Sequence, residues 1–457
     1  MSAVQPGLGW AGIARLGLVQ AMLGAVVVLT TSTLNRVMVV ELALPALVPG
    51  LLVALHYAVQ LSRPRMGFGS DTGARRTPWI MGGMGVLALG GALAAVATAW
   101  MGSRPQAGMV LAMLAFTLVG LGVSASGTAL LTLLAKRVDE PRRASAAAVV
   151  WVMMIVGFAV TAGMAGHWLD PYSPVRLVQV SGTVSLIAVL VTAVALWRLE
   201  GQVSAPGALQ DPAMTPTRFR QALAEVWAEP EARRFTLFVF VSMLAYSAQD
   251  LILEPFAGVM FGFTPGQSTQ LSGVQHGGTL AGMLLAALAG RRIGGASFGS
   301  LRAWTVGGCI ASCLALAGLV IAGLGAAPQW PLRANVFLLG VANGAFSIAA
   351  IGSMMALAGG GDGGRASREG TRMGLWGAAQ AIGFAGGGVI GTAASDLARW
   401  LLGAPGPAYA AVFAAESLLF IVAAWLAASI VVPTLRRRPS ESVARATPSA
   451  QVVQELR

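Results

Sequence analysis

The sequence predicts an all-α membrane protein with twelve transmembrane helices in two similar halves, and three observations support this. Of the 457 residues, 56% are hydrophobic and only 11% are charged, whereas soluble domains average about 25% charged residues. The apolar residues fall into about twelve runs of roughly 20 residues, which is the length that a helix needs to cross a bilayer. Basic residues gather in alternate loops between these runs, as they do in inner-membrane proteins.

The first half of the chain, residues 1–197, contains six predicted spans. Their Gly and Pro residues are compatible with membrane helices, because neighbouring helices satisfy the freed backbone groups. The predicted spans cover residues 13–35, 43–62, 79–100, 108–135, 144–166 and 175–197.

A polar connection, residues 198–234, separates the halves. Its first part, GQVSAPGALQDPAMTP, has the Pro and Gly content of a linker. In its second part, Phe219, Leu223 and Val226 recur on one side of a helix, which predicts an amphipathic helix on the cytoplasmic surface.

Residues 235–435 form the second predicted half. The polar tail, residues 436–457, has a composition typical of disorder. The six predicted spans of this half cover residues 235–258, 268–289, 303–325, 334–358, 373–394 and 408–432.

The distribution of basic residues tests the number of spans. When alternate loops are assigned to opposite sides, 25 of the 30 Lys and Arg residues fall on one side. The positive-inside rule then predicts that both termini are cytoplasmic. The net charge of +12 does not indicate nucleic-acid binding, because the basic residues lie in separate loops and form no stripe. The five residues on the other side are Arg36, Arg104, Arg176, Arg333 and Arg399.

The two halves resemble each other in sequence. GLGVSASGTALLTLLA from Gly120 matches the small-residue rhythm of GVANGAFSIAAIGSMM from Gly340, at an offset of 220 residues. His56 and His276 share that offset. Six plus six helices with an internal repeat are typical of the major facilitator superfamily (MFS). Further matches pair Trp151 with Trp376, and Asn35 and Glu41 with Gln249 and Glu254.

A loop motif stands between the second and third spans. GFGSDTGARR contains Gly67, Asp71, Arg75 and Arg76, and it resembles the loop motif of MFS carriers. Gly67 allows close helix approach, Asp71 can cap a helix start, and the two arginines suit an anionic membrane surface. The alternative is a generic positively charged cytoplasmic loop.

Six ionisable residues fall within the predicted spans, where a charge costs about 2.5–3.5 kcal/mol on insertion scales. A neutral imidazole at His56 or His276 could ligate the magnesium of a chlorin ring or bind a substrate; the alternative is a packed histidine. Trp151 and Trp376 could stack on a flat pigment or serve as ordinary packing residues. The six ionisable residues are Glu41, His56, Asp250, Glu254, His276 and Glu416.

Enzymatic signatures are missing from the sequence. It contains no HExxH, GxSxG or Walker A motif, no Cys/His metal cluster and no paired DxxxD motif of a membrane prenyltransferase. Cys309 and Cys313 share one helix face, and two thiols are too few for a zinc site. We therefore expect a protein that is not an enzyme.

Several stretches resemble a known family. Ser32–Leu42, which contains TLNRVMVVEL, followed by GFGSD at Gly67–Asp71, is similar to the PucC/LhaA family of light-harvesting assembly and bacteriochlorophyll-delivery proteins. LVGLGVSASGTALL and GHWLDPYSP extend the resemblance over most of the chain. The short N-terminus is closest to the branch labelled as a bacteriochlorophyll-synthase chain. The family motif residues in this chain are Asn35, Arg36, Glu41, Gly67 and Asp71.

The resemblance implies an MFS-like fold without established transport. It implies an assembly factor in the intracytoplasmic membrane that handles bacteriochlorophyll as bound pigment or cargo. The implied partners are light-harvesting antenna polypeptides, with bacteriochlorophyll synthase and the reaction centre as further candidates. The alternative function is proton-coupled transport of a small solute, in which Asp250 and Glu254 would serve gating and coupling.

Overall fold

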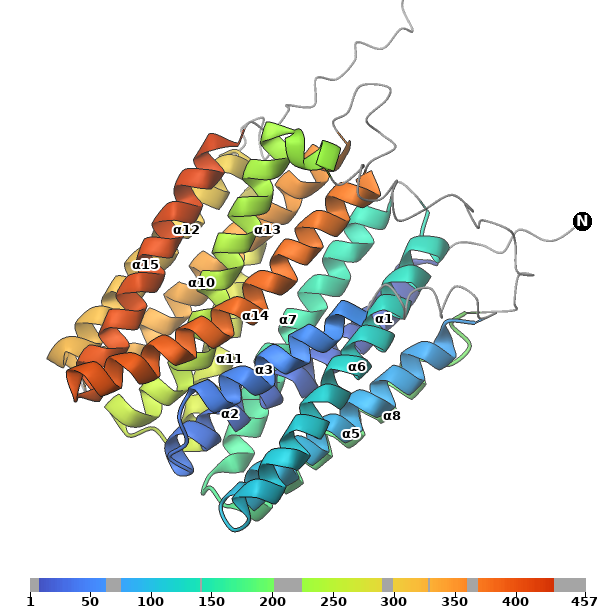
Figure 1. Cartoon of the computed structure of the whole chain (residues 1–457). Coiled ribbons are helices and arrows are strands. Elements are labelled where there is room, and N and C mark those ends of the chain that lie inside the picture. Colours follow the sequence, from blue (N-terminus) through green and yellow to red (C-terminus); the bar gives the residue numbers. More distant parts are fainter. Residues whose placement is uncertain are drawn as a thin grey trace, which may run out of the picture.

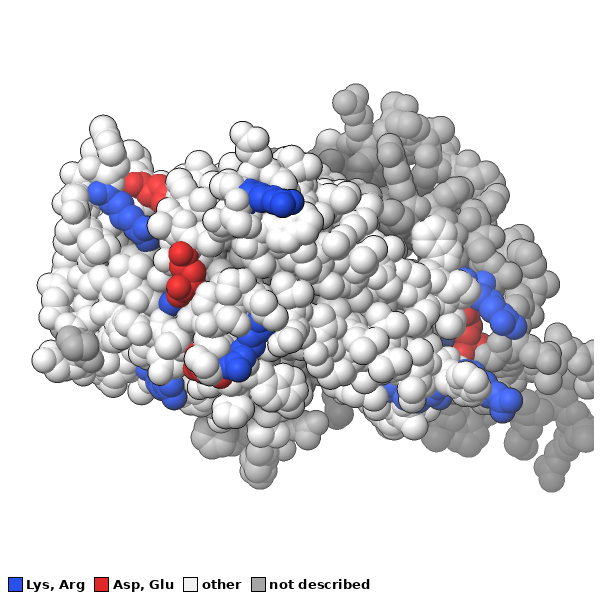
Figure 2. Space-filling model, turned by 90° about the horizontal axis from the view of Figure 1, so that it is seen from below, with Lys and Arg blue, Asp and Glu red and all other residues white. Residues whose placement is uncertain are grey.

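A computed structural model describes residues 8–62, 75–139, 142–200, 224–289, 299–327, 329–359 and 369–430. Within these ranges the elements are helices, and they lie side by side in an elongated bundle (Figure 1). We call the end that holds the start of α1 and the end of α15 the inner end, and the opposite end the outer end. Figure 2 shows two groups of charged residues separated by an uncharged band, as expected for a protein that spans a bilayer.

The N-terminal half begins with a continuous helical segment of 32 residues, Trp10–Glu41. It consists of α1 (Trp10–Val28), the π-helical turn η1 (Leu29–Thr33), α2 (Leu34–Arg36) and the π-helical turn η2 (Val37–Glu41). The half continues with α3 (Leu47–Val59), η3 (Gln60–Ser62), α5 (Thr77–Met101), α6 (Pro105–Arg137), α7 (Arg143–Leu169) and α8 (Pro174–Leu196).

The C-terminal half repeats this order of helices. Its first helix, α10, is again long and ends where Gly262 adopts a positive φ of 67°, a conformation that favours glycine. The helices are α10 (Pro230–Phe261), α11 (Pro265–Ala289), α12 (Leu301–Ile321) with η5 (Ala322–Ala326), α13 (Leu332–Gly359), α14 (Glu369–Leu402) and α15 (Pro405–Ser429).

Ten helices of the described chain are long and apolar enough to cross a membrane. The second helix of each half is the exception. α3 has only 13 residues, and α11 carries polar side chains such as Gln275 and His276. Both nevertheless pack within the bundle, α3 against α6 and α14, and α11 against α7 and α13. These neighbours supply the polar contacts that lipid cannot, which explains why a hydropathy threshold misses both helices.

The internal repeat is visible in helix packing. A Cβ on Gly120 of α6 would lie 2.6 Å from the backbone oxygen of His56 in α3. A Cβ on Gly340 of α13 would lie 2.1 Å from the backbone oxygen of Gln275 in α11. Only glycine permits such close approach of two helix backbones. The sequence offset therefore corresponds to equivalent contacts between the second and fourth helices of each half.

Basic residues near the inner end bind the last turn of each half. Arg15 of α1 donates to the backbone oxygen of Ala195 at 2.8 Å, and Arg234 of α10 donates to that of Ser429 at 3.2 Å. Because the last carbonyl groups of a helix lack partners within the helix, each arginine satisfies one of them. The first and last helices of each half are thereby joined at the same end.

The start of α5 is capped by a carboxylate from beyond the end of α8. Glu200 accepts hydrogen bonds from the backbone N–H groups of Arg76 at 2.6 Å and Thr77 at 2.8 Å. Burial opposes ionisation of Glu200, but these hydrogen bonds and the Arg76 charge outweigh it and lower its pKa. Of the loop motif, Arg75 and Arg76 lie just before α5, whereas Gly67 and Asp71 fall outside the described residues.

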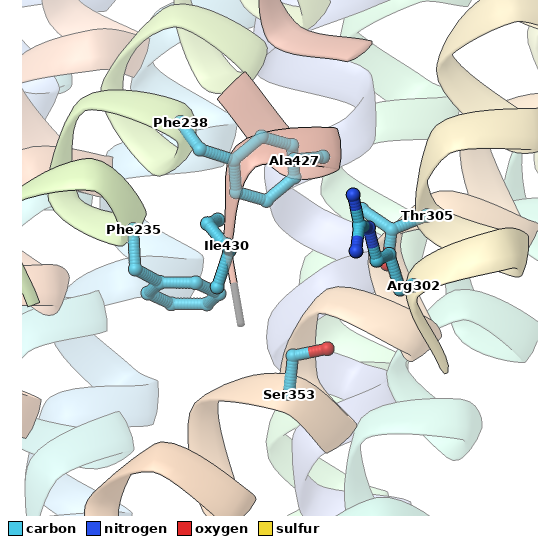
Figure 3. Close-up of a pocket in the computed structure, with 7 residues that line it drawn as sticks. All are labelled: Phe235, Phe238, Arg302, Thr305, Ser353, Ala427 and Ile430. Carbon is cyan, nitrogen blue, oxygen red and sulfur yellow. The ribbon is translucent and has the colours of Figure 1, made fainter. Parts of the chain in front are cut away.

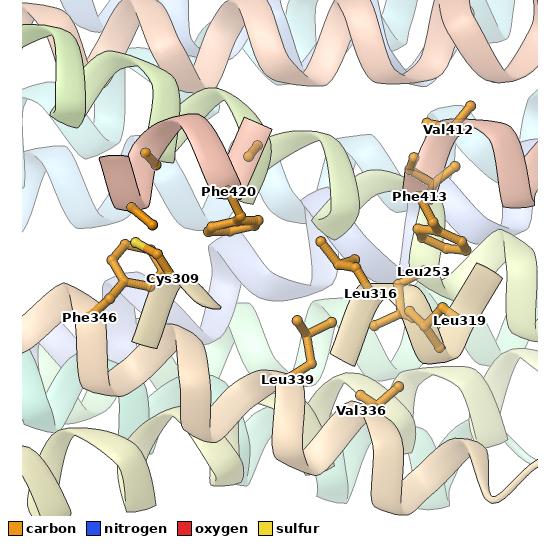
Figure 4. Close-up of a cluster of buried hydrophobic side chains, with 14 of the residues drawn as sticks. Leu253, Cys309, Leu316, Leu319, Val336, Leu339, Phe346, Val412, Phe413 and Phe420 are labelled. Atoms are coloured by element: carbon orange, nitrogen blue, oxygen red, sulfur yellow. The ribbon is translucent and has the colours of Figure 1, made fainter. Parts of the chain in front are cut away.

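Each half has its own apolar core. Figure 4 shows the core of the C-terminal half, where side chains of α10, α12, α13 and α15 meet. The N-terminal half has two clusters, one towards each end. In the predicted connection Val226 is fully buried, whereas Phe219, Leu223 and the tail 436–457 lie outside the described residues.

Candidate functional site

A polar cluster joins the two halves near the outer end. It is formed by the π-helical part of the first segment, by α10 and by α11. The Thr33 hydroxyl lies 3.0 Å from that of Thr269, and the Asn35 amide donates to the backbone oxygen of Leu251 at 2.5 Å. Asn35 and Thr269 are each 1% exposed. The two π-helical turns next to Asn35 fit a functional site, because π-bulges frequently occur at such sites.

Arg36 is the buried cation of this cluster, with 2% exposure. Its guanidinium donates to the Glu41 carboxylate at 2.5 Å and to the backbone oxygen of Phe263 at 2.6 Å. These contacts connect the first helix with the loop after α10. Burial and the Glu41 charge raise the pKa of Tyr172, in the loop between α7 and α8, and the Arg36 charge partly offsets them.

Two carboxyl groups of α10 face the same cluster. Glu254 is 2% exposed, and neither of its carboxyl oxygens makes a well-formed hydrogen bond; the Ser268 hydroxyl is only a weak contact. It lies within electrostatic reach of Arg36 and Asp250. Asp250 accepts a hydrogen bond from Gln275 of α11 at 3.2 Å. The cluster therefore holds more acidic than basic side chains, an arrangement that suits a cation or a proton rather than an anion.

His276 belongs to this cluster, whereas His56 lies elsewhere. His276 is 3% exposed; its Nδ1 is 2.8 Å from the backbone oxygen of Ser272, and its ring meets Phe158 of α7 edge-on at 4.9 Å. It also interacts electrostatically with Asp250. His56 of α3 is 1% exposed, and its Nε2 is 2.8 Å from Gln60 Nε2. The two imidazoles thus occupy equivalent helices but different surroundings.

The remaining predicted site residues do not join the cluster. Gln249 precedes Asp250 on α10, and its spacing from Leu253 points it into the core of the C-terminal half. Trp376 is buried in that core with its ring edge-on to Phe235 at 4.9 Å. Trp151 is half-buried on α7.

Two aspartates close the outer end between the halves. Asp396 of α14 accepts hydrogen bonds from the backbone N–H groups of Ala46 at 3.0 Å and Leu47 at 2.8 Å, at the start of α3. Asp170, which ends α7, accepts one from the Thr264 hydroxyl at 2.6 Å, just before α11. Each aspartate thus binds the start of the second helix of the other half, where a negative charge is favoured. The repeat could have identified this pair, since the two residues are 226 positions apart.

The described bundle is closed to a large ligand. Its most pocket-like void, lined by Phe235, Phe238 and Arg302 among others near the inner end, has a volume of about 10 Å³ (Figure 3). A second void, between α1, α5 and α8, has essentially no free volume. Ligand pockets usually measure about 300–1,000 Å³. In this conformation a chlorin ring therefore does not fit between the described helices.

Solved structures with similar folds are membrane transporters. One is the nucleoside transporter NupG, solved as a point mutant, with a TM-score of 0.64 and 13% identity over 92% of this chain and 99% of that one. Another is a bacterial homolog of the human lysosomal transporter Spinster, inward-facing and unoccupied, with a TM-score of 0.61 and 16% identity over 91% of this chain and 95% of that one. The MFS-like fold predicted from the repeat is thereby confirmed.

Comparison with curated proteins gives closer relatives. The chain is 54% identical over 424 residues to the "Bacteriochlorophyll synthase 44.5 kDa chain" of Rhodobacter capsulatus, covering 93% of this chain and 96% of that one. It is 31% identical to "Protein PucC" of the same organism (93% and 92% covered) and 32% identical to "Protein PucC" of Cereibacter sphaeroides (92% and 91%). A family model described as "PUCC protein" matches residues 33–435. The chain is therefore a multi-pass membrane protein that belongs to the PUCC protein family.

Proposed function

We propose that this chain is a membrane assembly factor for bacterial light-harvesting complexes, and that it binds bacteriochlorophyll or delivers it to antenna polypeptides. The observation that carries the proposal is the family match over residues 33–435, together with relatives named for bacteriochlorophyll synthase and for PucC. Bacteriochlorophyll synthase and the reaction centre are the further partners that we propose. The chain would act in the intracytoplasmic membrane with both termini in the cytoplasm, and without catalysing a reaction.

The closed bundle indicates where the pigment would bind. Because the described interior offers no chlorin-sized space, we place the macrocycle on the lipid-facing surface rather than between the helices. Of the three histidines in the chain, His56 and His276 are buried, whereas His167 is exposed near the outer end of α7. Trp168 beside it is 43% exposed and offers a flat ring at the membrane interface.

Purification from a pigment-producing host tests the proposal. The native chain should retain bacteriochlorophyll in mild detergent, as measured by its absorption spectrum. A nucleoside transporter of the same fold, produced in the same host, controls for pigment carried over with lipid. A colourless chain beside pigmented host membranes would refute pigment handling.

Three single variants locate the pigment. His167→Ala should lower the pigment-to-protein ratio, whereas His56→Ala and His276→Ala should retain it, with folding checked by gel filtration. If His56→Ala or His276→Ala loses pigment and His167→Ala keeps it, the macrocycle binds between helices, as the sequence analysis predicts for these two histidines. That result would refute binding on the lipid-facing surface.

The buried acids between the halves favour a second function, proton-coupled transport of a small solute. Glu254 and Asp250 lie where the two halves would separate during alternating access. Proton-driven uptake into vesicles that Glu254→Gln abolishes would support transport. Antenna assembly that survives Glu254→Gln would favour the assembly factor.

A further inference from the structure

A second set of buried polar side chains lies inside the C-terminal half. Gln249 of α10, Ser312 of α12, Asn343 of α13 and Glu416 of α15 are each between 0% and 2% exposed. We call these four residues the C-half polar layer. They are separate from the polar cluster between the halves, because all four point into the apolar core of one half.

Helical spacing shows that the layer faces this core. Gln249 lies four residues from both Ala245 and Leu253, and Glu416 lies between Phe413 and Phe420; these four neighbours are 0–1% exposed core residues. Side chains three or four positions apart share a helix face. Figure 4 shows Phe413 and Phe420 on α15 pointing towards side chains of the facing helices, so Glu416 between them points the same way.

The four residues lie at one depth. Gln249 is 12 residues before the outer end of α10, and Asn343 and Glu416 are each 11 residues after the outer starts of α13 and α15. At 1.5 Å per residue this is about 17 Å from the outer end, near the middle of a bilayer. Aromatic pairs lie on both sides of the layer, Phe346 with Phe420 inward and Phe256 with Phe413 outward.

The layer contains buried polar atoms without partners. Neither carboxyl oxygen of Glu416 and neither amide atom of Gln249 has a hydrogen bond, and Asn343 Nδ2 also has none. Ser312 is hydrogen-bonded to Gly308 and Asn343. An unpaired carboxylate at this depth is strongly unfavourable. Glu416 therefore needs a bound partner that the side chains alone do not provide.

No described cation faces Glu416. Among the titratable groups on the helices packed against α15, Cys309 and Cys313 of α12 are thiols, and Tyr409 of α15 is a phenol. On α14, Asp396 and Arg399 lie at the outer end, with Arg399 hydrogen-bonded to Tyr409. On α10, Asp250 and Glu254 face the inter-half cluster. On both helices that start at the inner end, the arginines bind the last turn of α15: Arg302 of α12 at Ala428 and Arg234 of α10 at Ser429.

The available space selects the partner. A water molecule needs a cavity of at least about 10–15 Å³ and several polar contacts. The best void of the described chain has about 10 Å³ and is lined by other residues near the inner end. A hydrated or bare metal ion would need at least comparable room. A proton needs none.

We propose that the C-half polar layer is a proton-binding site in which Glu416 is a neutral carboxylic acid paired with Gln249. The carboxyl O–H donates to the Gln249 amide oxygen, and the Gln249 amide N–H donates to the Glu416 carbonyl oxygen. One proton thereby gives partners to all four atoms that otherwise have none. The packing of α10 against α15 brings the two side chains into reach after small rotations.

Infrared difference spectroscopy of the full-length chain in detergent tests the proposal. A protonated carboxyl group has a C=O stretch separate from carboxylate and amide bands. Replacing Glu416 by Gln should remove intensity from the protonated band at neutral pH. The matched control, Glu41→Gln, alters an acid paired with Arg36 and should remove carboxylate intensity instead. Carboxylate loss in Glu416→Gln would overturn the proposal.

A second variant tests the pairing with Gln249. Gln249→Leu removes the acceptor but keeps the acid, so the protonated C=O band should move to higher frequency. An unchanged band would contradict the pairing. Thermal unfolding in sodium chloride and in choline chloride should give the same midpoint for the unaltered chain. Stabilisation by sodium that Glu416→Gln abolishes would instead identify a metal-ion site and refute the proton site.

Discussion

Replacing Arg36 by Gln removes the buried cation of the inter-half cluster. The arginine is 2% exposed and binds both Glu41 and the backbone oxygen of Phe263. Removing one member of a buried charge pair destabilises proteins by about 3–5 kcal/mol, because the other charge is left uncompensated. Here the loss also leaves Glu254 without its nearby cation. We therefore expect Arg36→Gln to destabilise the chain by about 3–5 kcal/mol.

The assay is thermal unfolding of the purified chain in mild detergent. A change of 1 kcal/mol shifts the midpoint by about 2–4 °C for a unit of 150–250 residues, so the expected shift is on the order of 10 °C. Arg104→Gln is the matched control, because Arg104 is an exposed outer-end arginine. Neutralising Glu41 as well should recover part of the loss. A midpoint for Arg36→Gln equal to that of Arg104→Gln would refute the reasoning.

Three further predictions follow from the contacts at the helix ends and between helices. Asp396→Ala removes both hydrogen bonds at the start of α3 and should lower stability by about 1–2 kcal/mol; no change in the unfolding midpoint would contradict the cap. Glu200, whose pKa is lowered in the fold, stabilises above its ordinary titration range and loses this effect as pH falls through its folded pKa. Glu200→Gln should therefore flatten the acidic side of the stability profile, and a profile parallel to that of the unaltered chain would argue against this role. Gly340→Ala places a Cβ 2.1 Å from a backbone oxygen and should be poorly folded in gel filtration, whereas Gly377→Ala, which meets open space, should not.

The sequence was sufficient to predict the architecture because the bilayer imposes simple rules. The number and order of helices follow from hydropathy and from the alternation of basic loops, and the fold follows from the repeat. The boundaries were less accurate at both ends of several helices. For example, the predicted span 373–394 lies within α14, which extends from Glu369 to Leu402, because amphipathic turns continue a helix beyond the lipid.

The site was harder to predict because helix rotation decides which side chains meet. Asn35, Glu41, Glu254 and His276 were selected for being polar at depth, and the structure brings them to one cluster. Gln249 is adjacent to Asp250 in sequence, yet a turn of about 100° directs it into another core. Arg36, selected only through the family motif, is the central cation of the cluster because it reaches the loop after α10.

Locking the two halves together tests most directly whether the chain works as a closed body rather than a transporter. Thr33 and Thr269 have hydroxyls 3.0 Å apart across the halves, so cysteines at both positions should form a disulfide when Cys309 and Cys313 are replaced by Ala. We predict that the oxidised, cross-linked chain restores pigmented antenna in a strain that lacks the native protein. Loss of assembly on oxidation, with recovery on reduction, would show that the halves must separate and would contradict the account.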